Sequence, residues 1–260
     1  MNSRRLAVCS LLAASAALLP ATALAACDAR SGSHTAALVE LYTSEGCSSC
    51  PPADRQLSRL EQELDKSAQV VALALHVGYW DYIGWKDPFA QAAFAHRQDW
   101  LVRANRRKTV YTPQFFVGGT ELRSWHGILG DTVRQLNALP AKAAIRVQAS
   151  LSADGTLALD AEATTGDRAG PAALFLALAE SGLVSTVTRG ENGGVTLAHD
   201  HVVREWIGPV RLTGGAVRLR REVTLPAAWN RARLEVVAFV QDERTGNVLQ
   251  AMNARQCAGS

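Results

Sequence analysis

Two cysteines separated by two residues are the part of this sequence with the clearest chemistry. The stretch "TSEGCSSCPPAD" (43–54) places Cys47 and Cys50 directly ahead of a proline pair. This spacing suits a redox-active dithiol, two thiolate ligands of Cu(I) or Zn(II) completed by a residue such as His76, or a permanent disulfide in a secreted binding protein. The elements that position the pair favour the first of these three roles.

A buried strand is predicted before the cysteines and an amphipathic helix after them. "ALVELYTS" (37–44) is an apolar run, and "DRQLSRLEQELDK" (54–66) carries leucines at spacings of three and four. The N-terminus of a helix presents unpaired N–H groups and a positive dipole end, which stabilise a thiolate. We therefore expect Cys47 to be the more exposed, attacking cysteine and Cys50 to resolve the mixed disulfide. A serine hydroxyl between them is expected to donate to the Cys47 sulfur.

The rest of the first half continues an alternation of strands and helices. The predicted elements are a strand over 69–77 parallel to the first, a helix over 87–105 capped by Asp87, a hairpin over 113–127 and a helix over 128–139. Their order is strand-helix-strand-helix-strand-strand-helix. After Pro140 the pattern changes to alternating apolar and polar residues separated by glycine-rich turns, which is typical of an antiparallel β-sandwich.

The fold expected from these patterns is therefore an α/β domain over residues 26–140, followed by an all-β antiparallel sandwich domain over residues 141–260. In a parallel sheet, ligands bind beyond the carboxyl ends of the strands. "HVGYWDYIGWKDPF" (76–89) follows the second strand and would lie beside the dithiol. The candidates for the rim of the site are His76, Tyr79, Trp80 and Asp81, with His76 or Asp81 as a proton carrier. Packing of the same loop against the sheet, with a neutral buried histidine, remains the alternative.

Three stretches together resemble known proteins. The C-x-x-C pair, the order of elements and Thr112-Pro113 at the start of the third strand resemble the thioredoxin superfamily. That resemblance implies a cis peptide bond at Pro113 beside the dithiol and a substrate-positioning role for Thr112 and Pro113. More narrowly, "VELYTSEGCSSCPPAD", "GYWDYIGWKDPFA" (78–90) and "YTPQ" resemble an exported family, domain of unknown function 1223. This second resemblance implies a thioredoxin-like fold over residues 37–139 and an exported protein. It implies no particular activity.

The first residues have the pattern of an export signal. Arg4 and Arg5 precede an apolar run and small residues end at Ala25, so residues 1–25 are predicted to be a signal peptide of a protein exported to a bacterial periplasm. After its removal, Cys27 and Cys257 remain as a second candidate disulfide. The alternative is a lipoprotein signal, in which Cys27 carries the lipid and Cys257 stays a free thiol.

Other patterns exclude several classes of function. The net charge of +3 is small for 260 residues and gives no reason to expect nucleic acid as a partner. We find no phosphate-binding glycine loop and no transmembrane segment in the mature sequence, and we expect no cofactor. His199 and His201 are predicted to be a solvent-facing pair on one strand. The leading hypothesis is an exported thiol-disulfide oxidoreductase that acts on a protein or small-molecule thiol with an unidentified redox partner, provided that the Cys47 sulfur is reachable.

Overall fold

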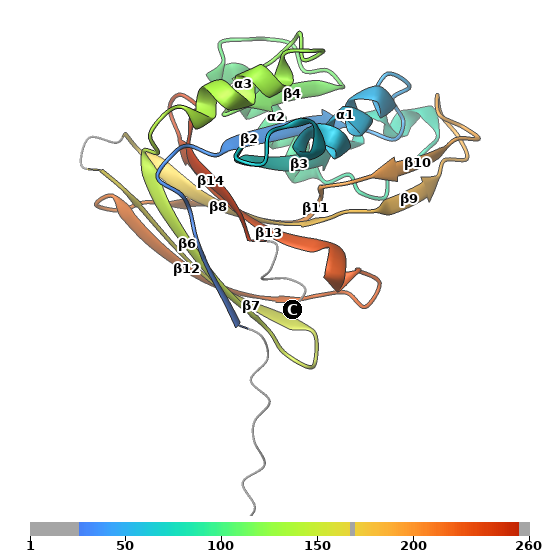
Figure 1. Cartoon of the computed structure of the whole chain (residues 1–260). Helices are drawn as coiled ribbons and strands as arrows, with labels where there is room; N and C mark the ends of the chain where they lie inside the picture. The colour runs from blue at the N-terminus through green and yellow to red at the C-terminus, as the bar shows by residue number, and fades with distance from the viewer. Residues whose placement is uncertain (1–25, 167–169, 255–260) are drawn as a thin grey trace, which may run out of the picture.

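The computed structural model describes residues 26–166 and 170–254 (Figure 1). Its strands form two β-sheets and a separate two-stranded hairpin. The larger sheet has eight strands in the order β14-β13-β8-β11-β3-β2-β4-β5. The smaller has four, in the order β1-β6-β7-β12, and β9 pairs only with β10 among the described strands. The predicted signal peptide and Cys257 lie outside the described residues.

The first half contains the expected order of strands and helices. After β1 (Ala26–Arg30), its elements are β2 (Ala37–Thr43), α1 (Pro51–Glu63), β3 (Val70–His76), the 3-10 helix η1 (Gly78–Ile83), α2 (Ala92–Ala104), β4 (Gln114–Val117), β5 (Thr120–Glu121) and α3 (Leu129–Asn137). Strands β2 and β3 are parallel, and Thr43 is opposite His76 where both strands end. The two strands therefore deliver their last side chains to the same edge of the sheet.

The predicted start of the second helix is wrong. Helix α2 begins at Ala92 rather than near Asp87, and its N-cap residue is Gln91. The Asp87 carboxylate instead accepts hydrogen bonds from the backbone N–H groups of Glu45, at 2.9 Å, and Phe89, at 2.9 Å. Asp87 caps no helix because its oxygens are used in a buried polar site described below.

The second half contributes strands to both sheets. Its elements are β6 (Ala143–Leu151), β7 (Thr156–Thr165), β8 (Ala172–Glu180), β9 (Leu183–Thr186), β10 (Thr196–His199), β11 (Val202–Arg211), β12 (Ala216–Thr224), the 3-10 helix η2 (Arg231–Arg233), β13 (Leu234–Asp242) and β14 (Val248–Ala254). Strand β11 pairs in parallel with β3, Val202 being opposite Ala74, and so continues the sheet begun by the first half. The architecture is a mixed sheet that spans both halves, packed on an antiparallel sheet.

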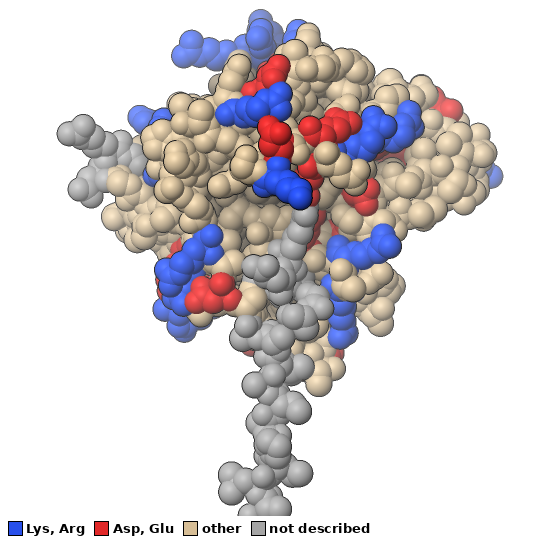
Figure 2. All heavy atoms as spheres, in the orientation of Figure 1, with Lys and Arg blue, Asp and Glu red and all other residues tan. Residues whose placement is uncertain are grey.

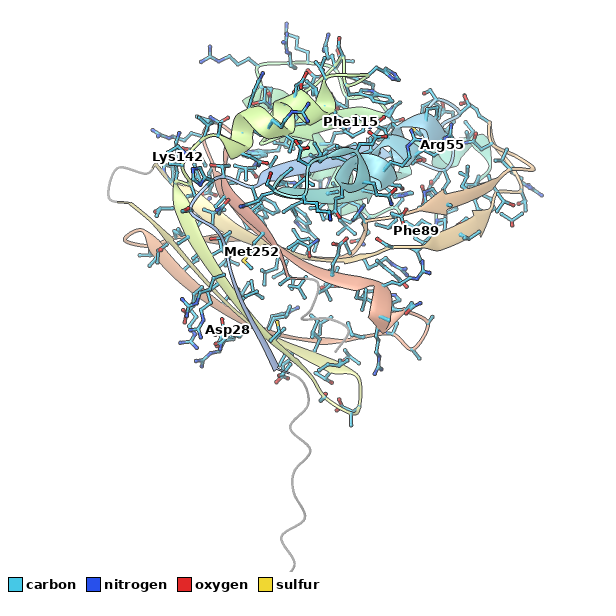
Figure 3. All side chains as sticks on the ribbon, viewed as in Figure 1. Asp28, Arg55, Phe89, Phe115, Lys142 and Met252 are labelled. Atoms are coloured by element: carbon cyan, nitrogen blue, oxygen red, sulfur yellow. A yellow bond between two sulfur atoms is a disulfide. The ribbon has the colours of Figure 1, made fainter. Side chains whose placement is uncertain are left out.

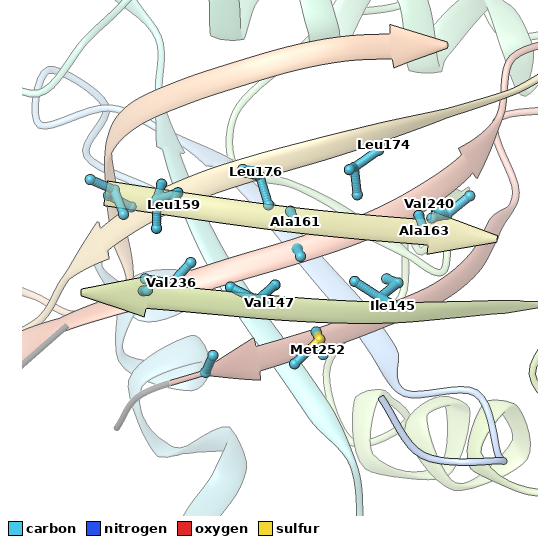
Figure 4. Close-up of a cluster of buried hydrophobic side chains, with 14 of the residues drawn as sticks. Ile145, Val147, Leu159, Ala161, Ala163, Leu174, Leu176, Val236, Val240 and Met252 are labelled. Carbon is cyan, nitrogen blue, oxygen red and sulfur yellow. The ribbon is translucent and has the colours of Figure 1, made fainter. Parts of the chain in front are cut away.

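Side-chain alternation explains how the layers pack. In β8, Leu174 and Leu176 face the core between the two sheets, whereas Phe175 and Ala177 face the core under α2. Strand β8 is thus buried on both faces, which accounts for its unbroken apolar run. Figure 4 shows the inter-sheet core, where Val147 and Leu159 of the smaller sheet lie near residues of the larger one.

Helices cover opposite faces of the β2–β3 region. Val39 of β2 packs with Leu57 of α1, and Leu38 packs with Phe94 of α2. Because side chains alternate along a strand, Thr43 lies on the same face as Val39, under α1. The end of the sheet beneath the start of α1 therefore receives polar side chains from β2 and β3.

Candidate functional site

The two cysteines of the C-x-x-C motif form a disulfide at the start of α1. The Cα atoms of Cys47 and Cys50 are 5.4 Å apart. Cys50 is the N-cap residue, and Pro51 is the first residue of the helix. Proline has no backbone N–H, and both prolines lie in the first turn, where N–H groups make no hydrogen bonds within the helix. The predicted position of the dithiol at a helix N-terminus is confirmed.

The exposure of the sulfur-bearing residues differs from the prediction. Cys47 is 1% exposed and Cys50 0%, although Ser48 and Ser49 between them are exposed. The expectation of an exposed Cys47 is therefore wrong for the disulfide form. The Ser49 hydroxyl lies 3.3 Å from the Cys47 sulfur, and it must be the donor because a disulfide sulfur carries no proton.

Trp80 connects the dithiol turn to the predicted substrate-positioning residues. Its indole Nε1 donates to Thr112 Oγ1 at 2.7 Å. A methyl group on Gly46, next to Cys47, would lie 3.0 Å from Trp80 Cβ. Thr112 and Pro113 are half-buried, and the bond between them is cis, as the thioredoxin resemblance implies. Trp80 therefore packs on the dithiol turn and also holds Thr112.

The other three rim candidates take different positions. Tyr79, 39% exposed, donates to Gln98 Oε1 at 3.4 Å. Asp81 is half-buried and accepts from the Asp87 backbone N–H at 3.2 Å. His76 is not a rim residue, because it is 0% exposed at the end of β3. The sequence predicted its position at the end of the second strand correctly, but the side chain is buried and does not lie at the surface.

Five titratable residues form what we call the buried polar cluster: Glu45, Asp54, His76, Asp87 and His199. Each is no more than 7% exposed. His76 Nδ1 lies 2.8 Å from Asp87 Oδ2, and His199 Nε2 lies 3.1 Å from Glu45 Oε1. The two imidazole centroids are 5.0 Å apart. Two acid–histidine pairs therefore meet through their rings in the interior.

Aromatic side chains enclose the cluster. The Trp85 indole N–H donates to Glu45 Oε2 at 2.8 Å. The Phe89 ring meets both imidazoles edge to face, at 5.3 Å from His76 and 5.7 Å from His199. Figure 3 places Phe89 near the β9–β10 hairpin, below α1, the helix that carries Arg55. This packing keeps the charged members of the cluster away from water.

Helix α1 brings Asp54 into the cluster. Asp54 follows Cys50 by four residues, so the two side chains lie on the same face of the first turn. Its Oδ1 has no hydrogen-bond partner among the described residues, and neither has His76 Nε2 or Thr43 Oγ1. Each of these three atoms is therefore a buried polar atom without a hydrogen bond to offset its desolvation.

Burial and charge set the protonation of the cluster. Burial raises the pKa of Asp54 above its ordinary value, against the opposing effect of His76 and His199. Burial alone would lower the pKa of His76, but the carboxylates of Asp87, Asp54 and Glu45 together outweigh it and the net shift is upward. Burial therefore favours the neutral form of Asp54, and the neighbouring carboxylates favour the protonated form of His76.

His199 and His201 do not form the predicted solvent-facing pair. Both are buried, and His201 Nδ1 lies 2.6 Å from Glu235 Oε1, away from the partner of His199. The backbone of His201 has φ +58°, a turn conformation that ends the alternation between β10 and β11. Within the described part of the chain, no three His, Cys, Asp or Glu side chains have a metal-binding arrangement.

The remaining sequence candidates lie away from this site. Cys27 is half-buried on β1 and takes part in a disulfide bond, while Cys257, its predicted partner, is outside the described residues. No helix in the described ranges is long and apolar enough to span a bilayer. On the face shown in Figure 2, positive and negative side chains are interspersed. A cavity of about 800 Å³ lies elsewhere, beside α2, with Arg97 and Trp206 in its wall.

Four members of the cluster were not predicted as site residues: Glu45, Asp54, Asp87 and His199. One signal was available, since Asp54 follows Cys50 at the spacing of one helical turn. His199 could not be found, because the contact with Glu45 joins residues 154 positions apart.

Comparisons with known proteins show the fold and the family of this chain. The crystal structure of protein AGR_C_4864 from Agrobacterium tumefaciens matches with a TM-score of 0.60 and 24% identity, over 85% of this chain and 94% of that one. HBP35 of Porphyromonas gingivalis matches with a TM-score of 0.67 and 14% identity, over 86% of this chain and 76% of that one. Identities this low show a shared fold alone. No curated protein matches. The sequence profile of DUF1223, a protein family of unknown function, matches residues 38–241, and the chain belongs to this family.

Proposed function

We propose that this protein is an exported thiol-disulfide oxidoreductase with a thioredoxin-like arrangement over residues 37–139. The observation that carries the proposal is the Cys47–Cys50 disulfide at the N-terminus of α1, with the buried polar cluster behind it. A helix N-terminus stabilises a thiolate, and buried acids and histidines can take up or release the protons that accompany exchange. The second half of the chain carries His199 and so completes the cluster.

The exchange follows two substitutions at sulfur. A thiolate of the partner attacks Cys47 Sγ, the Cys47–Cys50 bond breaks, and Cys50 leaves as a thiolate. A second thiolate of the partner attacks the mixed disulfide, forms the partner's own disulfide and releases Cys47. Two electrons pass from the partner dithiol to this protein, and the reverse sequence oxidises the protein again at the expense of a partner disulfide.

Asp54 is the proposed source of the proton for the Cys50 thiolate. It lies one helical turn from Cys50 and is favoured in its neutral form by burial. His76, whose charge acts on Asp54 within the cluster, is the proposed source of the proton that returns to Asp54.

Substrate positioning is proposed for the segment at Thr112 and Pro113. The segment is half-buried and is tied to the dithiol turn through Trp80. The partner is a protein or a small-molecule thiol or disulfide, and the chemistry needs no cofactor.

A specific observation favours a second function. Cys47 is 1% exposed, as expected of a disulfide that braces a secreted binding protein and never exchanges. Under this alternative the buried polar cluster would only stabilise the turn, and the disulfide would resist reduction.

Trapping of a mixed disulfide distinguishes the two functions. Cys50→Ser removes the resolving thiol, so the oxidoreductase account predicts a stable 1:1 adduct through Cys47 with a disulfide-containing peptide, seen by mass spectrometry. Cys47→Ser, with Cys50 as its remaining thiol of the pair, is the matched control and should form far less adduct. Equal or absent adducts in the two variants would support the brace.

A further inference from the structure

The turn of the β9–β10 hairpin covers the dithiol. We call residues 189–194 the capping loop. The loop holds its own shape through backbone hydrogen bonds, from Gly193 N–H to Gly190 O at 3.2 Å and from Gly194 N–H to Val187 O at 2.8 Å. Strands β9 and β10 form a two-stranded sheet separate from the two larger sheets. The capping loop is thus a compact unit at the end of a hairpin.

Two side chains of the capping loop bind the dithiol turn. Glu191 Oε2 accepts from the Ser48 backbone N–H at 2.9 Å and from the Ser48 hydroxyl at 2.7 Å. Asn192 Nδ2 donates to the carbonyl oxygens of Glu45 at 2.8 Å and Cys47 at 3.0 Å. These four hydrogen bonds link segments more than 140 positions apart in the sequence. On the side of the capping loop, all four are made by two adjacent side chains, Glu191 and Asn192.

The exposure of these residues shows where the contact would open. Glu191 and Ser48 are exposed, so their bonds compete with water. Asn192 is 6% exposed and lies over the backbone of Cys47, which is 1% exposed. A thiolate attacks a disulfide only when it can approach the sulfur directly. In the closed arrangement described here that approach is blocked.

We infer that the capping loop is a latch over Cys47, and that Glu191 and Asn192 are positioning residues that set how easily a thiol reaches the disulfide. Release of the four hydrogen bonds lets the loop swing away from the turn while its internal bonds remain. The inference concerns access to the site of the proposed oxidoreductase and rests on that function for its biological meaning. It also explains how a disulfide this well buried can still exchange.

The test measures opening and access separately. Opening is followed by hydrogen–deuterium exchange of the Ser48 amide, the donor to Glu191. Access is followed by the rate at which dithiothreitol reduces Cys47–Cys50, with alkylation and mass spectrometry of the peptide that contains both cysteines. Dithiothreitol transfers two electrons, becomes a cyclic disulfide and needs no biological partner. The result is therefore independent of whether the protein is an oxidoreductase.

Glu191→Ala removes the acceptor and should accelerate both rates roughly tenfold, the effect of losing hydrogen bonds to a charged group. Glu191→Gln keeps an uncharged acceptor and should give intermediate rates. Asn192→Ala should also accelerate reduction, with circular dichroism to confirm its fold. Glu222→Gln changes an exposed glutamate on β12 by the same charge and should behave like the wild type.

Graded acceleration from wild type through Glu191→Gln to Glu191→Ala, in both readouts, supports the latch. Unchanged reduction in both Glu191→Ala and Asn192→Ala overturns it, whatever the exchange rate of Ser48. Failure of the proposed function has another signature, since Cys50→Ser would then trap no partner even where the latch variants are reduced faster.

Discussion

At the scale of single residues, the site is unusual for the number of ionisable groups it buries. Glu45, Asp54 and Asp87 share the interior with His76 and His199. Burial of charge costs free energy unless each charge is paired, and the two acid–histidine contacts supply that pairing. Burial raises the pKa of Asp54, so the stability of the fold should depend on the protonation of this carboxyl group.

Asp54→Asn is predicted to stabilise the protein at neutral pH. Burial raises the pKa of Asp54 in the folded state. The free energy of unfolding therefore falls as pH rises from the unfolded pKa, about 3.9, toward the folded pKa. The variant has no such loss. Its free energy of unfolding in urea should therefore exceed that of the wild type at pH 7 and approach it near pH 3. Asp65→Asn makes the same substitution at an exposed position and should show no such pH dependence. The same pH dependence in both variants would contradict a raised pKa at Asp54.

Asp87→Asn should be strongly destabilising, because it leaves a buried His76 without its counter-ion. Loss of one partner of a buried pair costs about 3–5 kcal/mol. The pKa of His76 is raised, so the pair stabilises the fold below the unfolded pKa, about 6.5, and this stabilisation is lost as pH rises through the folded pKa. Chemical unfolding at pH 6 and pH 9 should show the larger cost at pH 6.

The exposed Asp99–Arg103 pair is the control for that experiment. Asp99→Asn should change the free energy of unfolding by less than about 1 kcal/mol at either pH. A cost for Asp87→Asn that is equally small, or that grows toward pH 9, would show that His76 is not held protonated by Asp87.

At the scale of elements, local patterns predicted most strands and helices but not how polar residues are used. The leucine spacing predicted α1, and the glycine pair at 118–119 predicted the β4–β5 hairpin. Asp87 has the sequence of a helix cap, yet α2 starts later because His76 and Glu45 bind its carboxylate. Local propensity depends on neighbouring residues only and does not include partners this far away in the sequence. The start of α2 and the members of the cluster therefore could not be predicted.

The β4–β5 turn also provides a test of packing between elements. Gly119 has φ +87°, and a methyl group there would lie 1.8 Å from the carbonyl oxygen of Gly246 in the β13–β14 turn. Gly119→Ala should therefore lower the free energy of unfolding by about 2–5 kcal/mol, from backbone strain and the forced movement of a turn. Gly127→Ala has a similar φ, +77°, with no atom within 4 Å of the new methyl group, and should cost only about 1–2 kcal/mol. Equal melting temperatures for the two variants would contradict the close approach of the turns.

At the scale of the whole molecule, the first and second halves share a sheet and a core. Phe94 and Leu101 of α2 pack with Phe175 and Phe239 of the second half. The sequence indicated a strand-rich second half correctly, but the pairing of β11 with β3 is a contact between distant segments that alternation cannot reveal. The division of the chain at residue 140 stays a prediction.

A fragment of residues 26–140 tests that division. It would expose the edge of β3 and uncover Arg97, whose guanidinium pairs with Glu40 and stacks near Phe175 and Trp206. We expect the fragment to unfold without a cooperative transition in urea, whereas the full chain unfolds cooperatively. A cooperative transition in the isolated fragment would show that the first half is an independent domain.

The reduction potential of Cys47–Cys50 tests the central claim most directly. It is obtained by equilibrating the full chain with thiol–disulfide buffers and quantifying the alkylated peptide that contains both cysteines, which separates this pair from the disulfide of Cys27. A working oxidoreductase should have a potential between about −120 and −270 mV, the range of known exchange proteins. A value below about −300 mV would identify a permanent structural disulfide and contradict the proposed function.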